Sequence, residues 1–129
     1  SKALRAHSDG DVLVHSLIDA ILGAINAGDI GAHFPDDDVQ YKNANSLDLL
    51  QNIYKLMSSE GYFLMNMDAT IILEKPKLSK YIDKMKENIA ETLNCSTDIL
   101  SIKATTSEGI GFVGRQEGIA CLCSILLDK

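Results

Sequence analysis

The chain has 129 residues, of which 46% are hydrophobic, and it carries a formal net charge of -6. This length and composition suit one domain with its own core, and the acidity argues against binding to nucleic acid, which needs basic patches. No apolar run approaches the roughly 18 residues of a membrane span, so no membrane partner is expected. A phosphate ligand would be neutralised largely by metal ions, because acidic residues outnumber Lys and Arg by 18 to 12.

Residues 1–9 are expected to end a strand and to lead into the first helix. Ser8 or Asp9 can cap that helix, and apolar residues at helical spacing carry it to about Ala27. Gly28 then predicts its end, because glycine is the residue most often found just past a helix C-terminus.

A long polar loop follows through Asn45, and loops of this length in a compact domain are usually functional or disordered. Asn45 or Ser46 is expected to cap a second helix, which ends at Gly61. The last two strands are separated by a glycine-rich turn over 107–116. The remaining elements are predicted as a strand, a helix and two strands, over Tyr62–Leu73, Ser79–Leu93, Ile99–Thr106 and Gly118–Leu127.

This order of elements predicts an α+β fold, with helices packed on one face of a small mixed β-sheet. The last strand is apolar on both sides, with Cys121 and Cys123 facing one way and Leu122 and Leu126 the other. The helices can cover only one side, so the other predicts an interface between subunits. The cysteines have no CxxC spacing and are expected to be reduced and buried.

Asp11, His15 and Asp19 recur every four residues and therefore share one face of the first helix. A carboxylate and an imidazole at this spacing are suited to a metal ion. A helix N-terminus favours a carboxylate such as Asp11 without any function, however, and a lone histidine is often a hydrogen-bonded structural residue. The pattern leaves a metal site and a structural polar network open.

The segment 103–111 carries the clearest chemistry. Thr105, Thr106 and Ser107 lie at a strand end before a glycine-rich turn, where hydroxyls and backbone N–H groups can hold a phosphate. Glu108 can hold a divalent cation such as Mg²⁺, and Arg115 adds an anion-binding candidate. An ordinary strand end and turn is the alternative.

Two other segments have plainer explanations beside a functional one. Residues 75–78 could offer backbone groups to a base or a sugar, or they could form a simple turn from strand to helix. Three consecutive aspartates at 36–38 could chelate a cation, but such a charge run is more typical of a solvated turn, which we favour.

Four motifs occur in order along the chain: His-Ser-Asp-Gly-Asp-x-x-x-His at 7–15, Gly-Asp-Ile-Gly-x-x-Phe-Pro-Asp at 28–36, Pro-Lys at 76–77 and Lys-Ala-Thr-Thr-Ser-Glu-Gly-Ile-Gly-Phe-x-Gly-Arg at 103–115. Together they resemble the 2-C-methyl-D-erythritol 2,4-cyclodiphosphate synthases of the non-mevalonate isoprenoid pathway. The resemblance implies a homotrimeric phosphorus–oxygen lyase, with sheets facing each other and active sites between subunits. Its reaction would be an intramolecular, metal-dependent phosphoryl transfer that closes 4-diphosphocytidyl-2-C-methyl-D-erythritol 2-phosphate into the cyclic diphosphate and releases CMP.

The resemblance also assigns residues. It implies that His15 is a zinc ligand, that Glu108 binds Mg²⁺ or Mn²⁺, and that His7 and Thr106 stabilise the transition state. It leaves Asp11 and Asp19 as supporting residues. The implied substrate contacts are Ser8 for a phosphate, Asp29 and Gly31 for the erythritol, and a loop over the substrate made of Phe34, Pro35, Asp36, Asp37 and Asp38. The implied cytidine pocket consists of Leu73, Pro76, Lys77 and Leu78, and the cytidine diphosphate is held by Ala104 and Thr105. Phe112 and Arg115 are implied to line a central channel that takes isoprenoid diphosphates, with Arg115 also at the substrate.

One part of the family pattern has no counterpart here. The other two zinc ligands of the family form an Asp-x-His pair on an N-terminal strand, and no such pair precedes His7. We therefore expect residues 1–129 to form one synthase domain that lacks this strand segment, with zinc held by His15 and by ligands outside this sequence. Without them we expect little zinc and poor activity. A non-catalytic trimeric module that binds isoprenoid diphosphates or nucleotides is the alternative. The Lys, Asn and Ile content slightly favours a plastid over a bacterial cytoplasm.

Overall fold

The computed structural model describes residues 2–35, 45–74 and 79–129, with side chains from residue 10 onward. None of the helices in these ranges is long and apolar enough to cross a membrane. The elements in chain order are α1 (Lys2–Ala24), α2 (Ile30–His33), α3 (Ser46–Ser59), β1 (Phe63–Ile72), α4 (Ser79–Leu93), the 3₁₀ turn η2 (Thr97–Ile99), β2 (Leu100–Thr105), α5 (Gly111–Gly114) and β3 (Ala120–Asp128).

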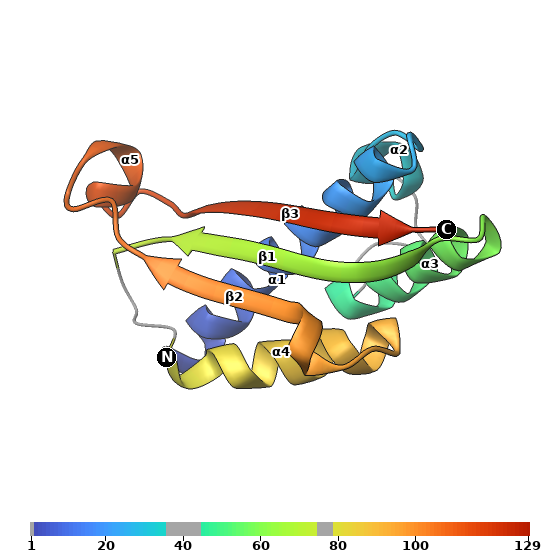
Figure 1. Ribbon diagram of the computed structural model, residues 1–129. Helices are drawn as coiled ribbons and strands as arrows, with labels where there is room; N and C mark the ends of the chain where they lie inside the picture. Colours follow the sequence, from blue (N-terminus) through green and yellow to red (C-terminus); the bar gives the residue numbers. More distant parts are fainter. Residues whose placement is uncertain (1, 36–44, 75–78) are drawn as a thin grey trace.

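The three strands form one mixed sheet in the order β2-β1-β3 (Figure 1). β1 is parallel to β2, to which it is linked through α4, and antiparallel to β3. In Figure 1, α1 and α3 lie behind the sheet, α4 runs below it beside β2, and the opposite face of the sheet is turned toward the viewer. The predicted α+β architecture, with helices on one face of a mixed sheet, is confirmed.

The core lies between this sheet and the helical layer. It is built from the apolar stripe of α1 and from the inward positions of α3, β1 and α4. These positions recur at helical spacing in α1 and α3 and at alternate residues in β1, which is why one face of each element is buried. The fully or almost fully buried side chains include Leu13, Leu17, Ile18, Ile21, Leu22, Leu50, Ile53, Met57, Met67, Ile71 and Ile89.

The first helix differs from its prediction at both ends. Residues 1–9 were expected to end a strand, but α1 begins at Lys2 and runs without a break, and the Lys, Ala, Leu and Arg residues of this stretch are good helix formers. The helix stops at Ala24 rather than near Gly28. Asn26 takes the left-handed conformation (φ 55°), and the N–H of Ala27 donates to Leu22 O at 2.9 Å, which closes the helix end.

The other helix boundaries agree with the sequence pattern. Asn45 caps α3, since its side-chain oxygen accepts from Leu47 N, and Gly61 ends the same helix with φ 88°. α4 occupies the predicted range. The short helix α2, by contrast, lies inside the predicted loop and is capped by Asp29 Oδ1, which accepts from Ala32 N at 2.9 Å.

The open face of the sheet exposes part of its apolar surface. Leu122 and Leu126 of β3 are 69% and 56% exposed, whereas Cys121 and Cys123 are half-buried against the core. Both cysteines are free thiols, and burial raises the pKa of Cys123 to about 12. The two sides of β3 therefore differ as predicted: one packs on the helices, and within the described residues the other remains uncovered.

Candidate active site

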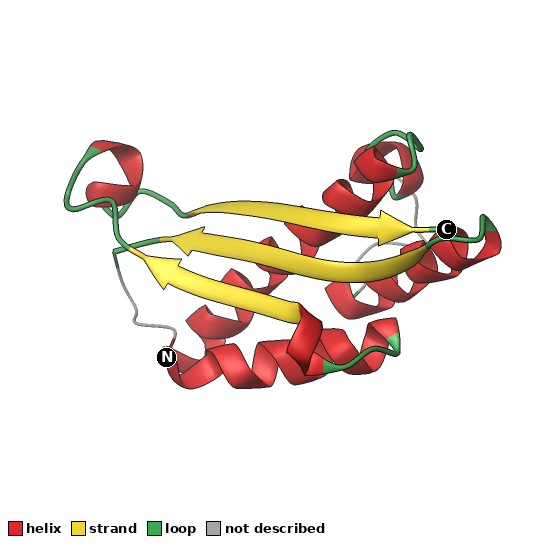
Figure 2. Cartoon of the chain, viewed as in Figure 1, coloured by secondary structure: helices red, strands yellow, loops and turns green. Residues whose placement is uncertain are grey.

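The parallel strands β1 and β2 end at the same edge of the sheet, and the chain continues from both ends into predicted binding segments (Figure 2). Ile72 pairs with Thr105, and Leu73 N–H donates to Thr105 O at 3.0 Å. The stretch that includes Ala104, Thr105 and Thr106 is exposed here and lies beside the start of the predicted cytidine segment at Leu73, whose side chain is buried. Parallel pairing therefore brings together two motifs that are about 30 residues apart in the sequence.

The turn after β2 is tied to the end of β1 by Glu74. Its Oε1 atom accepts from Ser107 N at 3.0 Å and from Gly109 N at 3.3 Å. Ser107 Oγ lies 2.9 Å from the same oxygen and 2.8 Å from Ile110 O, and its single proton can go to only one of them. These hydrogen bonds, that of the Ser107 hydroxyl first, lower the pKa of Glu74. Glu74 was not singled out in the sequence.

Glu108 occupies a strained position in this turn. It takes the left-handed conformation (φ 55°), which is uncommon for a residue with a side chain, and Gly109 follows with φ 78°. The N–H of Glu108 donates to Thr106 Oγ1 at 3.2 Å. Because that oxygen is an acceptor here, the hydroxyl proton of Thr106 can be donated to a ligand. The side chains of Thr106 and Glu108 are both exposed.

Beyond the turn, α5 carries Phe112 and leads to Arg115. Ile110 and Phe112 are 74% and 50% exposed, which leaves an apolar tip at this end of the sheet. Arg115 is ion-paired with Glu117, with Nε 2.6 Å from Oε1. Both side chains are more than half exposed, so this pair contributes little stability and can be exchanged for an anionic ligand.

The polar stripe of α1 divides into structural residues and one available imidazole. Asp11 Oδ1 accepts from Ser46 Oγ at 2.5 Å, which ties α1 to α3, and Asp19 Oδ1 accepts from Ile30 N at 2.8 Å, which ties α1 to α2. His15 is exposed, and within the described ranges its side chain makes no hydrogen bond. The two aspartates therefore connect α1 to neighbouring elements, whereas His15 makes no such connection among the described residues.

A zinc site needs more ligands than His15 provides. Zinc sites in proteins have at least three protein ligands. Among the residues from 10 onward that the structure describes, no group of three or more His, Cys, Asp or Glu side chains could hold a metal ion. An exposed imidazole and an exposed carboxylate at Glu108 suit the donor preferences of Zn²⁺ and Mg²⁺, respectively, but each fits as one ligand of an incomplete set.

The predicted erythritol pair lies at the other end of the sheet. Asp29 and Gly31 are exposed beside α2, and α2 and α5 stand at opposite ends of the ribbon in Figure 1. Phe34, predicted to belong to a loop over the substrate, instead packs into the core at 9% exposure, and Pro35 is half-buried. His33 also has a local role, because Nε2 donates to Ala27 O at 2.6 Å.

Several predicted site residues lie outside the described parts of the structure. Asp36, Asp37 and Asp38 fall in the first undescribed range, and Pro76, Lys77 and Leu78 fall in the second. For His7 and Ser8 the structure gives the helical backbone alone. Their roles stay predictions.

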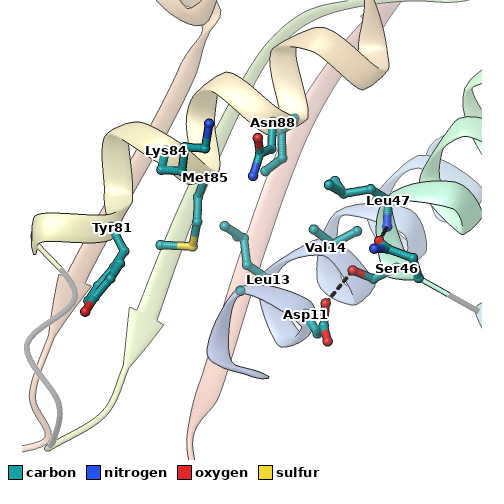
Figure 3. A pocket seen from close by; sticks show the side chains of 12 residues that line it. Asp11, Leu13, Val14, Ser46, Leu47, Tyr81, Lys84, Met85 and Asn88 are labelled. Atoms are coloured by element: carbon teal, nitrogen blue, oxygen red, sulfur yellow. Dashed lines mark hydrogen bonds between the residues drawn. The ribbon is translucent and has the colours of Figure 1, made fainter. Parts of the chain in front are cut away.

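The described residues also form a pocket in the helical layer, between α1, α3 and α4 (Figure 3). It has a volume of about 350 Å³ and is mostly apolar, with Leu13, Val14 and Met85 on its walls. The hydrogen bond from Ser46 to Asp11 lies at one side. No residue predicted to bind substrate or metal lines this pocket.

Comparison with solved structures places this fold among the cyclodiphosphate synthases. The bifunctional IspDF protein of Campylobacter jejuni matches with a TM-score of 0.86 and 46% identity, over 90% of this chain and 31% of that protein. The IspF protein of Plasmodium falciparum, solved as a CDP complex, matches with a TM-score of 0.79 and 32% identity, over 90% of this chain and 69% of the other.

Sequence relatives agree. The 2-C-methyl-D-erythritol 2,4-cyclodiphosphate synthase of Clostridioides difficile is 51% identical over 130 residues, covering 99% of this chain and 81% of the relative. The synthase of the same name from Listeria monocytogenes is 52% identical over 128 residues. The chain belongs to the YgbB family, which it matches over residues 1–128. These relatives are bacterial and give no support to the plastid location suggested by composition.

Proposed function

We propose that this chain is a 2-C-methyl-D-erythritol 2,4-cyclodiphosphate synthase, converting 4-diphosphocytidyl-2-C-methyl-D-erythritol 2-phosphate into the cyclic diphosphate and CMP. The observation that carries the proposal is the turn after β2, in which the side chains of Thr106 and Glu108 are both exposed at the end of the parallel strands and the Glu108 N–H donates to the Thr106 hydroxyl. This turn belongs to a chain that is 51% identical to the synthase of Clostridioides difficile.

The chemistry requires no general base, because the nucleophile is already an anion. An oxygen of the 2-phosphate forms a bond to the β-phosphorus, and the bond from that phosphorus to the bridging oxygen breaks, so that the oxygen leaves with CMP. Catalysis then comes from holding attacker and leaving group in line and from stabilising the charge on the phosphoryl oxygens. Thr106 fits the second task, since its hydroxyl accepts from Glu108 N and can donate its proton to a phosphoryl oxygen.

The positions of the two substrate-binding regions support an active site between subunits. The helix α2, which Asp29 caps and which contains Gly31, lies near one end of β3, and α5, which follows the Thr106 turn, lies near the other (Figure 1). β3 has nine residues and spans roughly 30 Å of extended chain. The 2-phosphate on the erythritol must touch the β-phosphorus, so the two regions must come from different copies. A homotrimer joined through the open sheet face, with Leu122 and Leu126 in the interface, meets this requirement.

Divalent cations would complete the site, and they supply positive charge to phosphate oxygens when bound. The candidate ligands are His15 for Zn²⁺, together with ligands outside this sequence, and Glu108 for Mg²⁺ or Mn²⁺. Both side chains are exposed. His7 is proposed as the second stabiliser and Ser8 as a phosphate contact. Residues 36–38 are proposed to contact the substrate, and residues 76–78 are proposed to contact its cytidine. Phe112 and Arg115 are proposed to line a channel for isoprenoid diphosphates. The bacterial relatives favour a bacterial cytoplasm.

CMP release from the proposed substrate, with Mg²⁺ and with or without added Zn²⁺, tests this function. Thr106→Val is expected to lower kcat about 100-fold or more, as for the loss of a hydrogen-bond donor to a transition state. Thr97→Val is the matched control, because Thr97 is an exposed threonine of η2, away from the turn. His15→Ala is expected to lower the zinc content measured by mass spectrometry as well as the rate. Binding of CDP without CMP release under either condition would refute the proposal in favour of a non-catalytic module.

A further inference from the structure

Glu74 connects the ends of the two parallel strands through several hydrogen bonds. It directly follows Leu73, whose N–H donates to Thr105 O and extends the strand pairing by one step. Its Oε1 atom then accepts from two backbone N–H groups of the turn, Ser107 N at 3.0 Å and Gly109 N at 3.3 Å, with the Ser107 hydroxyl at 2.9 Å. A carboxylate with backbone donors makes charge-assisted hydrogen bonds, which are stronger than neutral ones.

The turn that Glu74 contacts contains a residue in an uncommon backbone conformation. Glu108 takes the left-handed conformation, which residues with a side chain rarely adopt unless the surroundings hold it. On its other side the turn is packed against α5, since a Cβ on Gly114 would lie 2.0 Å from Gly109 C. Gly109 is therefore held between the Glu74 carboxylate and the backbone of α5.

We propose that Glu74 is a positioning residue, which holds the 106–109 turn so that Thr106 and Glu108 face the diphosphate and its cation. The carboxylate acts through the turn and does not itself touch the substrate. Because residues 75–78 follow Glu74 directly, the same side chain joins the proposed cytidine segment to the proposed diphosphate segment. This inference rests on the proposed function, and it adds Glu74 to the residues that the reaction requires.

Two variants and one control test it. Glu74→Ala removes the acceptor, and Glu74→Gln keeps an amide oxygen in its place without the charge. Glu87→Ala is the matched control, because Glu87 is an exposed glutamate of α4 that pairs with Lys84, away from the turn and from the open sheet face. The measurements are amide hydrogen exchange at Ser107 and Gly109, Mn²⁺ binding by electron paramagnetic resonance in the presence of CDP, whose phosphates can supply the oxygen ligands that Glu108 alone does not, and the kcat and KM of CMP release.

In Glu74→Ala we expect exchange at both amides to be faster by about tenfold or more, because each loses its acceptor. Mn²⁺ binding should weaken about tenfold, as when a residue that orients a metal ligand is removed. We expect kcat to fall more than KM rises, since Thr106 and Glu108 act on the transition state. Glu74→Gln should recover most of each loss, and Glu87→Ala should match the wild type in all three measurements.

Unchanged exchange at Ser107 and Gly109 in Glu74→Ala would overturn the inference, as would unchanged Mn²⁺ binding. Equal losses in Glu87→Ala would also overturn it, because they would show a general loss of stability. A wild-type protein that releases no CMP would instead defeat the proposed function. The exchange measurement and Mn²⁺ binding with CDP do not depend on turnover and would still decide the role of Glu74.

Discussion

The two ends of the sheet use their polar residues differently. At the α2 end, Asp19 accepts from Ile30 N, Asp29 from Ala32 N, and His33 donates to Ala27 O, so these side chains hold the chain's own backbone. At the α5 end, Thr106 and Glu108 point their side chains into solvent, and Glu74 does the holding. At the α2 end, a proposed substrate contact, Asp29, also accepts a hydrogen bond from the chain's own backbone. At the α5 end, the proposed contacts are Thr106 and Glu108, and a different residue, Glu74, holds the turn. Each end therefore holds only part of the proposed site.

The largest effect is expected from inactivating one end of the sheet in one variant and the other end in a second variant. Asp29→Ala and Thr106→Val should each be nearly inactive as homotrimers. When the two variants are mixed and reassembled, they should regain about a quarter of wild-type CMP release. A site is intact only if one subunit supplies Asp29 and its neighbour supplies Thr106, and each condition holds for about half of the subunits. Mixing without subunit exchange is the control. If activity does not return after exchange, both ends serve the same chain's site and the comparison fails.

A charge on the open sheet face should break the assembly that joins the two ends. Leu122 is 69% exposed and lies on the side of β3 away from the helices. Leu122→Asp is expected to shift the protein from trimer to monomer in light scattering, with its helical circular dichroism retained, because a buried unpaired carboxylate is costly at an interface. Lys80→Asp, at an exposed position of α4, should leave the trimer intact. A monomeric wild type, or a trimeric Leu122→Asp, would contradict the proposed interface.

Asp19 tests whether the α2 end is braced as the structure indicates. Asp19→Ala removes the acceptor of Ile30 N, and an exposed hydrogen bond of this kind contributes about 1 kcal/mol. We expect faster amide exchange at Ile30 and a small loss of stability to urea, while exchange at Gly109 stays as in the wild type. Asp19→Asn keeps an oxygen acceptor, so its exchange at Ile30 and its stability to urea should lie between those of the wild type and of Asp19→Ala. Equal changes at both ends would show that they are not independent.

The smallest effect concerns the middle of the sheet, between the two ends. The hydrogen bond and charge of Lys103 lower the pKa of Asp68 in the folded protein. A depressed carboxyl pKa stabilises the fold above the unfolded pKa, and this contribution is lost as the pH falls through the folded pKa. As the pH is lowered from 6 through the folded pKa of Asp68, the free energy of unfolding measured with urea should therefore fall slightly less in Asp68→Asn than in the wild type. Because both side chains are 56% exposed, the difference is expected to be small and to shrink in salt.

Local signals predicted most of the regular elements. Helical spacing predicts α4, the capping oxygen of Asn45 predicts the start of α3, and Gly61, which takes a positive φ, predicts its end. Each signal depends on only a few neighbouring residues. The same signals were wrong at residues 1–9, where helix-forming residues continue α1 to Lys2. They also missed α2, whose first N–H, on Ile30, donates to Asp19 on α1.

The site was predictable where a motif carried it and not where packing did. Thr106 and Glu108 could be singled out because hydroxyls and a carboxylate at a glycine-rich strand end suit a phosphate and a cation. Asp11 and Asp19 could not be told from metal ligands by spacing alone, and the structure engages both in hydrogen bonds between helices. Phe34 was predicted to belong to the loop over the substrate, yet its ring is part of the core.

By itself the sequence determined the class of fold, the family and the chemical character of the turn after β2, because these depend on residue types and on spacing along the chain. Only the tertiary structure decided that Glu74 holds this turn, that the aspartates of α1 are braces and that α2 lies at the far end of the sheet from α5. The physical reason is that strand order and helix packing set these contacts, and they join residues 11 to 35 positions apart.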